Sequence, residues 1–160
     1  MFYSFFESAK HVGLLLPVAL LRVFFGIYYF QQATAKYTGD YLVRPRLAAM
    51  AQEWLPLSEA PQQYKYFVET IVIPNWQIFA WSITGAEFLI AVSFLLGYLV
   101  RPAALLGIFL SLNLLAISGP ASEDFFRSML AVHLMLGWIG AGRCLGIDYW
   151  FYKRNRGLWW

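Results

Sequence analysis

Charged residues and cysteine are both scarce in this chain. Charged residues occupy 13% of the 160 positions, whereas a soluble domain carries roughly 25%, so a water-facing surface around the whole molecule is not expected. The single cysteine, Cys144, excludes an intramolecular disulfide and a CxxC redox pair, which weighs against quinone-linked thiol oxidases. The two histidines, His11 and His133, lie on different segments. A bis-histidine haem is therefore not expected, and no metal-ligand spacing occurs.

Apolar residues are abundant, since 60% of the positions are hydrophobic and 19% are aromatic. A membrane-crossing helix needs about 20 mostly apolar residues. The sequence predicts one all-α membrane domain, 1–160, folded as an integral membrane four-helix bundle in contact with the lipid bilayer. Its parts are four spans over about 12–35, 76–99, 103–118 and 123–142, a helical loop over 36–75 and a tail over 143–160. The net charge is only +3 and the basic residues are scattered, so no nucleic-acid partner is predicted.

The long loop is expected to contain one or two short amphipathic helices. The first is predicted over Arg46 to Trp54, ending before Pro56. In the second, opened by Pro61, apolar residues recur at helical spacing: Tyr64, Phe67, Val68, Ile71 and Val72. This helix is expected either to lie on the membrane surface or cap the bundle, or to pack outside the membrane without lipid contact.

The first span also has to be distinguished from a cleaved signal. Ala33-Thr34-Ala35 has the small-residue pattern of a cleavage site. The apolar run before it exceeds the usual 7–15 residues and contains Arg22, and no basic cluster precedes it. We therefore expect a retained helix.

Lysines and arginines in the connections predict the orientation. One side would hold six, in short segments: Lys10, Arg101, Arg143, Lys153, Arg154 and Arg156. The other would hold five, diluted over the long loop: Lys36, Arg44, Arg46, Lys65 and Arg127. Both termini are therefore predicted to be cytoplasmic. Interfacial anchors are expected at five tryptophans: Trp76, Trp138, Trp150, Trp159 and Trp160.

Helical spacing predicts inward faces of small and polar residues on three spans. The first face holds Ala19, Arg22, Gly26, Ala33 and Lys36. The second holds Ala80, Thr84, Glu87 and Ala91. The third holds His133, Gly137, Gly140 and Cys144.

Arg22 and Glu87 are the two charges that lie deep in predicted spans. At about 1.5 Å per residue both lie near the middle of a span, and pairing would relieve the cost of burying each charge. We therefore predict an Arg22–Glu87 ion pair, which either fixes helix register or forms part of a functional site. For His133 an internal hydrogen bond is favoured over catalysis, and for Asn113 an interhelical hydrogen bond is favoured.

The chain resembles the DoxX/DoxD family of four-helix membrane proteins over about 16–148. The segments that carry the resemblance are LRVFFGIYYFQQATAK, YKYFVETIVIPN, AWSITGAEFLIAVSFLLGYLVRPAALLG, LNLLAISG and GWIGAGRCLGIDYW. Ala33 stands where glycine is expected in many family members, a departure that keeps the position small.

The resemblance implies a role in respiratory or redox metabolism in a bacterial or archaeal cytoplasmic membrane. DoxD-like proteins are the membrane subunit of a thiosulfate:quinone oxidoreductase and work with a partner subunit, while DoxX-like relatives associate with sulfur-transfer and superoxide-detoxifying proteins. In such a reading the chain binds no intrinsic cofactor, and a membrane quinone is its acceptor. Arg22, Glu87 and His133 would then be catalytic. Tyr28, Tyr29, Lys36 and Asn113 would contact the quinone or substrate.

Two other functions are consistent with the sequence. The first is a non-catalytic accessory subunit of a larger respiratory or photosynthetic complex, which suits the small size, the aromatic exterior and the absence of cofactor ligands. The second is a small transporter, which ranks last because four short spans lack the broken helices and paired repeats common in transporters.

Overall fold

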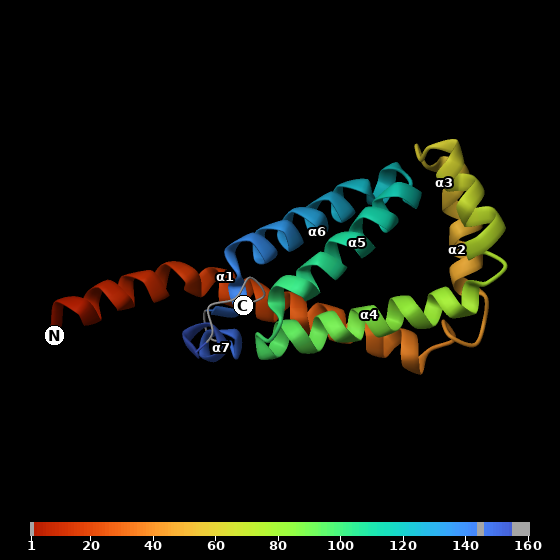
Figure 1. The fold of residues 1–160 in the computed structure, drawn as a ribbon. Helices are drawn as coiled ribbons and strands as arrows, with labels where there is room; N and C mark the ends of the chain where they lie inside the picture. Colours follow the sequence, from red (N-terminus) through yellow and green to blue (C-terminus); the bar gives the residue numbers. More distant parts are fainter. Residues whose placement is uncertain (1, 144–145, 155–160) are drawn as a thin grey trace.

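The computed structural model describes residues 2–143 and 146–154, and within these ranges the chain is helical without any β-strand (Figure 1). The predicted all-α class is therefore confirmed. The longer helices are α1 (Phe2–Thr38), α4 (Trp76–Leu96), α5 (Val100–Ile117) and α6 (Pro120–Ile139). The shorter elements are α2 (Arg46–Trp54), η1 (Leu55–Leu57), α3 (Gln62–Phe67), η2 (Val68–Val72), η3 (Ala141–Arg143) and α7 (Asp148–Arg154).

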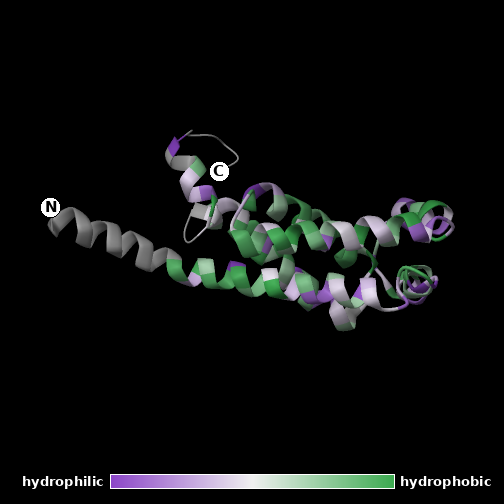
Figure 2. Cartoon of the chain, turned by 90° about the horizontal axis from the view of Figure 1, so that it is seen from below, coloured by the Kyte–Doolittle hydropathy of each residue, from purple (hydrophilic) through white to green (hydrophobic). Residues whose placement is uncertain are grey.

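Two of the described helices, α4 and α5, are long and apolar enough to cross a membrane. Figure 2 shows apolar residues along the middle of the long helices, with polar residues gathered in the loop helices and in α7. The described part of α6 begins with a polar turn that contains Glu123, Asp124 and Arg127. The predicted tail anchors Trp159 and Trp160, and Cys144 on the third inward face, lie outside the described residues.

The long helices pack in two pairs, α1 with α4 and α5 with α6, and α4 contacts α5 across the middle. In Figure 1 the pairs meet near α7 and diverge toward the end where α2 and α3 lie. Helix α1 runs antiparallel to α4, since Gly26 lies against the backbone and side chain of Leu95. A methyl group at Gly26 would lie 2.9 Å from a side-chain carbon of Leu95, so the glycine permits this close approach.

The register between α1 and α4 is shifted from the one expected. Arg22 lies beside Gly97, just beyond the end of α4, so the first half of α1 extends past the turn between α4 and α5, as Figure 1 shows. The second half of α1 supplies the inward face, where Ala19, Arg22 and Ala33 are buried. The predicted small and polar faces of α1 and α4 are therefore confirmed.

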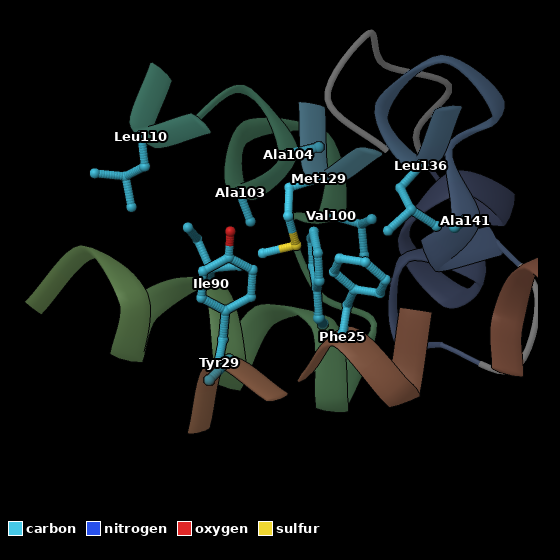
Figure 3. Close-up of a cluster of buried hydrophobic side chains, with 12 residues drawn as sticks. Phe25, Tyr29, Ile90, Val100, Ala103, Ala104, Leu110, Met129, Leu136 and Ala141 are labelled. Atoms are coloured by element: carbon cyan, nitrogen blue, oxygen red, sulfur yellow. The ribbon is translucent and has the colours of Figure 1, made fainter. Parts of the chain in front are cut away.

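A core of alternating large and small side chains joins the four long helices. Phe25 and Tyr29 point from α1 toward α5 and α6, and Met129 points back toward them (Figure 3). Small residues on α5, Ala103 and Ala104, leave room for these rings. Large apolar side chains face outward, as lipid contact requires.

The helix ends differ from the predicted ends at two places. Gly97 and Gly140 end α4 and α6 in the left-handed conformation, with φ of 65° and 66°, which glycine adopts without a Cβ clash. The turn between α4 and α5 lies at 97–99, and Pro102 lies in the first turn of α5. The N-cap of α6 is Gly119, because Pro120 already begins the helix.

Helices α2 and α3 and the η2 turn cover the diverging end of the helix pairs, and we call these three elements the covering layer. Ala51, Leu55 and Val68 form a buried cluster with Ile117 at the end of α5. Of the predicted apolar face, Val68 is buried, whereas Phe67 and Ile71 are exposed. The contacts of Val68 with the end of α5 favour the expectation that this segment caps the bundle.

Candidate functional site

Arg22 binds the segment that follows α6. Its Nη1 donates a hydrogen bond of 2.8 Å to the carbonyl oxygen of Ala141, and its side chain is 1% exposed. The guanidinium packs against Gly97 and Gly146, where an added Cβ would clash. These contacts place a buried cation at the C-terminal end of α6, which favours positive charge.

Asp148 joins the segment that follows α6 to the turn between α4 and α5. Its carboxylate accepts hydrogen bonds from the backbone N–H of Leu99 at 2.8 Å and of Val100 at 3.1 Å. Its own backbone N–H donates to the carbonyl oxygen of Gly97 at 2.9 Å. Gly142 gives the carboxylate room, since a methyl group there would collide with it. We call Arg22, Ala141, Asp148 and the Gly97–Leu99 turn the clasp.

The predicted Arg22–Glu87 ion pair is wrong. Arg22 lies in the clasp, beside Gly97, while Glu87 lies ten residues earlier on α4, or about 15 Å away along the helix. The prediction places the two charges at one depth because hydropathy assigns the whole apolar run from 12 to 35 to the span. The structure instead extends α1 past the turn, so that Arg22 reaches the end of the helix pair.

Glu87 pairs with Lys36 instead. Lys36 Nζ donates to Glu87 Oε1. Glu87 is 6% exposed, and the side chain of Lys36 is 22% exposed. Lys36 lies two residues before the end of α1, so its long side chain reaches inward from the diverging end of the helix pairs. The second oxygen, Glu87 Oε2, is buried and has no hydrogen-bond partner within the described residues.

The ring of one tyrosine contacts this pair, and two further tyrosines lie within its electrostatic range. Lys36 Nζ lies 5.4 Å from the centre of the Tyr41 ring, in the range of a cation–π contact. Burial raises the pKa of Tyr41 above its usual range, and the negative charge of Glu87 adds to this increase. Tyr28 and Tyr29 also lie within the electrostatic range of Glu87. We call these five residues, Lys36, Glu87, Tyr28, Tyr29 and Tyr41, the Lys36–Glu87 site.

Tyr29 connects this site to the core. Its hydroxyl lies beside Ser111 on α5, and its ring contacts the ring of His133 at a centroid distance of 5.5 Å. Ser111 is 2% exposed. Tyr29 thus joins α1 to α5 and α6 in the core.

His133 is packed in the centre of the molecule. It is fully buried, and its ring contacts Phe25 and Phe94 as well as Tyr29. Nδ1 lies 2.6 Å from the carbonyl oxygen of Met129, which assigns the proton to Nδ1. Nε2 has no hydrogen-bond partner within the described residues and faces Gly107, where a methyl group would collide with the ring. This environment is that of an internal, hydrogen-bonded histidine.

Asn113 lies at the other surface of the bundle, away from the Lys36–Glu87 site. Its Oδ1 accepts a hydrogen bond of 2.9 Å from the Tyr64 hydroxyl of α3, and its Nδ2 donates to the carbonyl oxygen of Phe109. The predicted interhelical hydrogen bond is therefore present, and it joins the covering layer to α5. A shallow cavity of about 200 Å³ lies nearby, lined in part by Leu57, Pro61 and Leu115; the predicted site residues do not line it.

Of the seven predicted site residues, Lys36 and Glu87 form an ion pair, and Tyr28, Tyr29 and His133 meet through ring contacts in the core. Arg22 and Asn113 each lie elsewhere. Sequence reasoning missed three residues that complete these sites. Asp148 had a signal, the run of glycines before it, whereas Tyr41 and Ser111 had none because their roles depend on helix register.

Among residues 2–143 and 146–154, no three His, Cys, Asp or Glu side chains are grouped so that they could hold a metal ion. A family model described as DoxX matches residues 18–118, more than half of the chain. The match includes Arg22, Lys36 and Glu87, and it ends before His133 and Asp148. No curated protein matches the chain. No solved structure matches it either.

Proposed function

Because the chain belongs to the DoxX family of membrane proteins, we propose that it is a membrane subunit of a quinone-linked redox system, with the Lys36–Glu87 site as the place where a quinone ring binds. The observation that carries this proposal is a buried carboxylate oxygen without a partner, beside an ammonium group and among tyrosine rings. Ionisable groups at such depth mark functional sites more often than chance.

The residues fit the chemistry of a quinone ring. Reduction of a quinone to a quinol consumes two electrons and two protons, and a carboxylate within hydrogen-bond reach of the ring oxygen can hold and deliver a proton. Glu87 supplies that carboxylate. Lys36 orients it through Oε1. Tyr28, which is half-buried, offers a flat apolar face on which a ring can pack.

The electrons must come from a donor outside this chain. The lone cysteine and the absence of metal clusters in the searched residues leave the described side chains without a redox centre of their own. We propose a partner subunit that delivers electrons, with thiosulfate as the donor in the DoxD-like case. The proposed location is a bacterial or archaeal cytoplasmic membrane.

The proposal assigns different tasks to the remaining candidates. Arg22 holds the clasp, and His133 fills the space beside Gly107. Both act on the position of the helices rather than on a substrate. Asn113 holds the covering layer through Tyr64.

Thiosulfate-dependent reduction of a short-chain quinone by the purified complex tests this function. We expect Glu87→Gln to lower turnover at least about 100-fold, as loss of a general acid–base group does. Lys36→Gln should lower it as well, while Glu69→Gln, an exposed carboxylate on η2, serves as the matched control and should leave it unchanged.

A second function, a non-catalytic accessory subunit, is favoured by the contacts of Arg22 and His133, which hold helices together. Full turnover in both the Glu87 and the Lys36 variants would support it and exclude the quinone site. Purification of the chain from native membranes only as a free monomer or homo-oligomer would contradict the accessory role.

A further inference from the structure

We infer that the exposed side of the short helix α7 binds the headgroup of an anionic phospholipid, in the leaflet next to the clasp. The binding surface consists of Ile147, Tyr149, Trp150 and Arg154, and we call these four residues the α7 face. No residue of the α7 face belongs to the Lys36–Glu87 site, so the inference does not depend on the proposed redox function.

The clasp determines which side of α7 is exposed. Asp148, the first residue of α7, is 2% exposed and is held by the turn between α4 and α5. The backbone N–H of Ile147 donates to the carbonyl oxygen of Leu96 at 3.2 Å. Three residues after Asp148, the ring of Phe151 contacts the ring of Tyr98 at a centroid distance of 5.6 Å. Residues three apart share one side of a helix, so Asp148 and Phe151 place that side against the bundle and leave the other side outward.

The α7 face combines apolar side chains with a cation. Ile147, Tyr149 and Trp150 are 42%, 55% and 57% exposed. Arg154 is exposed too, and its guanidinium lies 5.6 Å from the centre of the Trp150 ring, within the range of a cation–π contact. At a membrane–water interface an aromatic ring lies at the level of the headgroups and a long basic side chain extends to the phosphates. The α7 face has both components side by side.

The position of α7 in the fold is that of an interfacial segment. Helices α4 and α5 are long and apolar enough to cross a membrane, and α7 lies beside the turn that joins them (Figure 1). This turn is where the chain leaves the hydrocarbon core and enters it again. The α7 face is therefore at the depth of the headgroups of this leaflet.

The charge of this part of the chain selects an anionic lipid. The sequence from 143 to 156 contains four basic residues, Arg143, Lys153, Arg154 and Arg156. Asp148 is the single acidic residue of the sequence from 125 to 160, and its buried carboxylate accepts the N–H groups of the turn. Exposed positive charge of this kind attracts anionic lipids, and a planar guanidinium binds a phosphate through two parallel hydrogen bonds.

Native mass spectrometry of the full-length chain, released from mixed detergent–lipid micelles, tests the inference. The probes are phosphatidylglycerol and phosphatidylcholine with the same acyl chains, supplied in equal amounts. We expect the wild-type chain to retain phosphatidylglycerol at least about fivefold more than phosphatidylcholine, the factor that one basic side chain at a membrane surface supplies. Arg154→Gln should lower this preference about fivefold, and Trp150→Ala should lower it as well.

Control variants separate lipid binding from folding and from net charge. Arg154→Lys keeps the charge and should retain most of the preference. Arg44→Gln removes an exposed cation from the opposite end of the bundle and should leave the preference unchanged. Each variant should melt at the wild-type temperature in phosphatidylcholine micelles, because each substituted side chain is exposed.

The contrary outcomes are distinct. Equal retention of the two lipids by the wild-type chain would overturn the inference. A preference that survives both Arg154→Gln and Trp150→Ala would show that the anionic lipid binds elsewhere and would overturn the assignment to α7. An acidic peptide, poly-glutamate, is the probe for a protein partner: binding of this peptide that requires Arg154, together with equal retention of the two lipids, would replace the lipid by an acidic protein surface.

Discussion

Among single residues, Glu87 has the greatest consequence for stability because it is charged, buried and paired with Lys36. A buried charge whose partner is removed destabilises strongly, whereas replacement of both charges by apolar side chains is often neutral. The Lys36–Glu87 pair therefore constrains the relative position of α1 and α4 more than it stabilises the fold. Its retention in an otherwise apolar helix pair is consistent with the proposed site.

This asymmetry gives a measurable prediction. Lys36→Met should lower the free energy of unfolding by about 3 kcal/mol, because it leaves the Glu87 carboxylate buried alone. Lys36→Met combined with Glu87→Leu should recover most of that loss. Thermal unfolding in detergent measures both, and Arg44→Gln, in an exposed pair with Asp40, should change stability by less than about 1 kcal/mol. A double variant no more stable than Lys36→Met would contradict the pairing.

Two glycines in the spans are predicted to behave in opposite ways. Gly107→Ala should destabilise by about 1–3 kcal/mol, as overpacking does, because the new methyl group would collide with the His133 ring. Gly85→Ala meets no atom within 4 Å and should be neutral or stabilising by up to about 1 kcal/mol, since alanine favours helix. Unfolding of the two variants side by side measures the difference, and equal effects would argue against close packing at Gly107.

The sequence predicted which residues are buried better than it predicted which residues contact one another. Helical spacing identified the buried faces that contain Ala19, Arg22, Glu87 and His133 correctly. It paired Arg22 with Glu87 because hydropathy cannot show where along a long apolar helix the packed part begins. Lys36 lay on the predicted inward face, and only the antiparallel register shows that it reaches Glu87.

At the scale of the helices, the clasp joins segments that lie far apart in the sequence. Arg22 and Asp148 together join α1, the turn between α4 and α5, and the segment after α6. The turn contains Leu99 at a φ of 53°, an unfavourable value for a residue with a side chain. The hydrogen bonds from Leu99 and Val100 to Asp148 hold the turn in this conformation.

Substitution of Asp148 should show the strength of that hold. Asp148→Ala leaves the N–H groups of Leu99 and Val100 without acceptors and should destabilise by about 1–3 kcal/mol. Asp148→Asn keeps one acceptor oxygen, so its free energy of unfolding should lie between those of the wild type and Asp148→Ala. Leu99→Gly in the Asp148→Ala background should recover part of the loss, because glycine relieves the backbone strain. Thermal unfolding measures each step, and a wild-type melting temperature in Asp148→Ala would refute the role.

The covering layer should respond to alkaline pH. Burial raises the pKa of Tyr64 above its usual value, so the folded state favours the neutral phenol. The resulting stability is fully present below about pH 10, the pKa of a free tyrosine, and is lost as the pH rises through the raised value. Tyr64→Phe should cost about 1 kcal/mol at neutral pH, for the lost hydrogen bond to Asn113, and should weaken the alkaline loss.

Melting temperatures at pH 8 and pH 11 check this prediction. The difference between the two should be smaller in Tyr64→Phe than in the wild type. Part of it should persist, because the pKa of Tyr41 is raised as well. An equal difference in both proteins would show that Tyr64 does not contribute to the alkaline transition.

The longer helices were predictable in type and their ends less so, and the helix α7 inside the predicted tail was not foreseen. The helix over Arg46 to Trp54 was predicted with its exact bounds, since Pro45 and Pro56 flank it. The bounds of α4 and α6 shifted by about three residues, because left-handed glycines, rather than the last apolar residue, end these helices. The predicted helix after Pro61 divides into α3 and the wider η2 turn, a change that periodicity cannot show.

For the molecule as a whole, the structure places all connections at two ends. The turn between α4 and α5, the clasp and α7 lie at one end, and α2, α3 and the start of α6 lie at the other (Figure 1). Arg22 belongs to the first end and adds to the six basic residues already predicted there. The shift in register thus strengthens the charge asymmetry from which a cytoplasmic clasp and an external covering layer are predicted.

Cysteine labelling in whole cells tests this orientation. In a chain whose Cys144 is replaced by alanine, Glu53→Cys on α2 and Tyr149→Cys on α7 introduce thiols at exposed positions on opposite ends. We expect a membrane-impermeant maleimide to label the Glu53 variant in intact cells and the Tyr149 variant only after permeabilisation. The reverse pattern would place the covering layer in the cytoplasm.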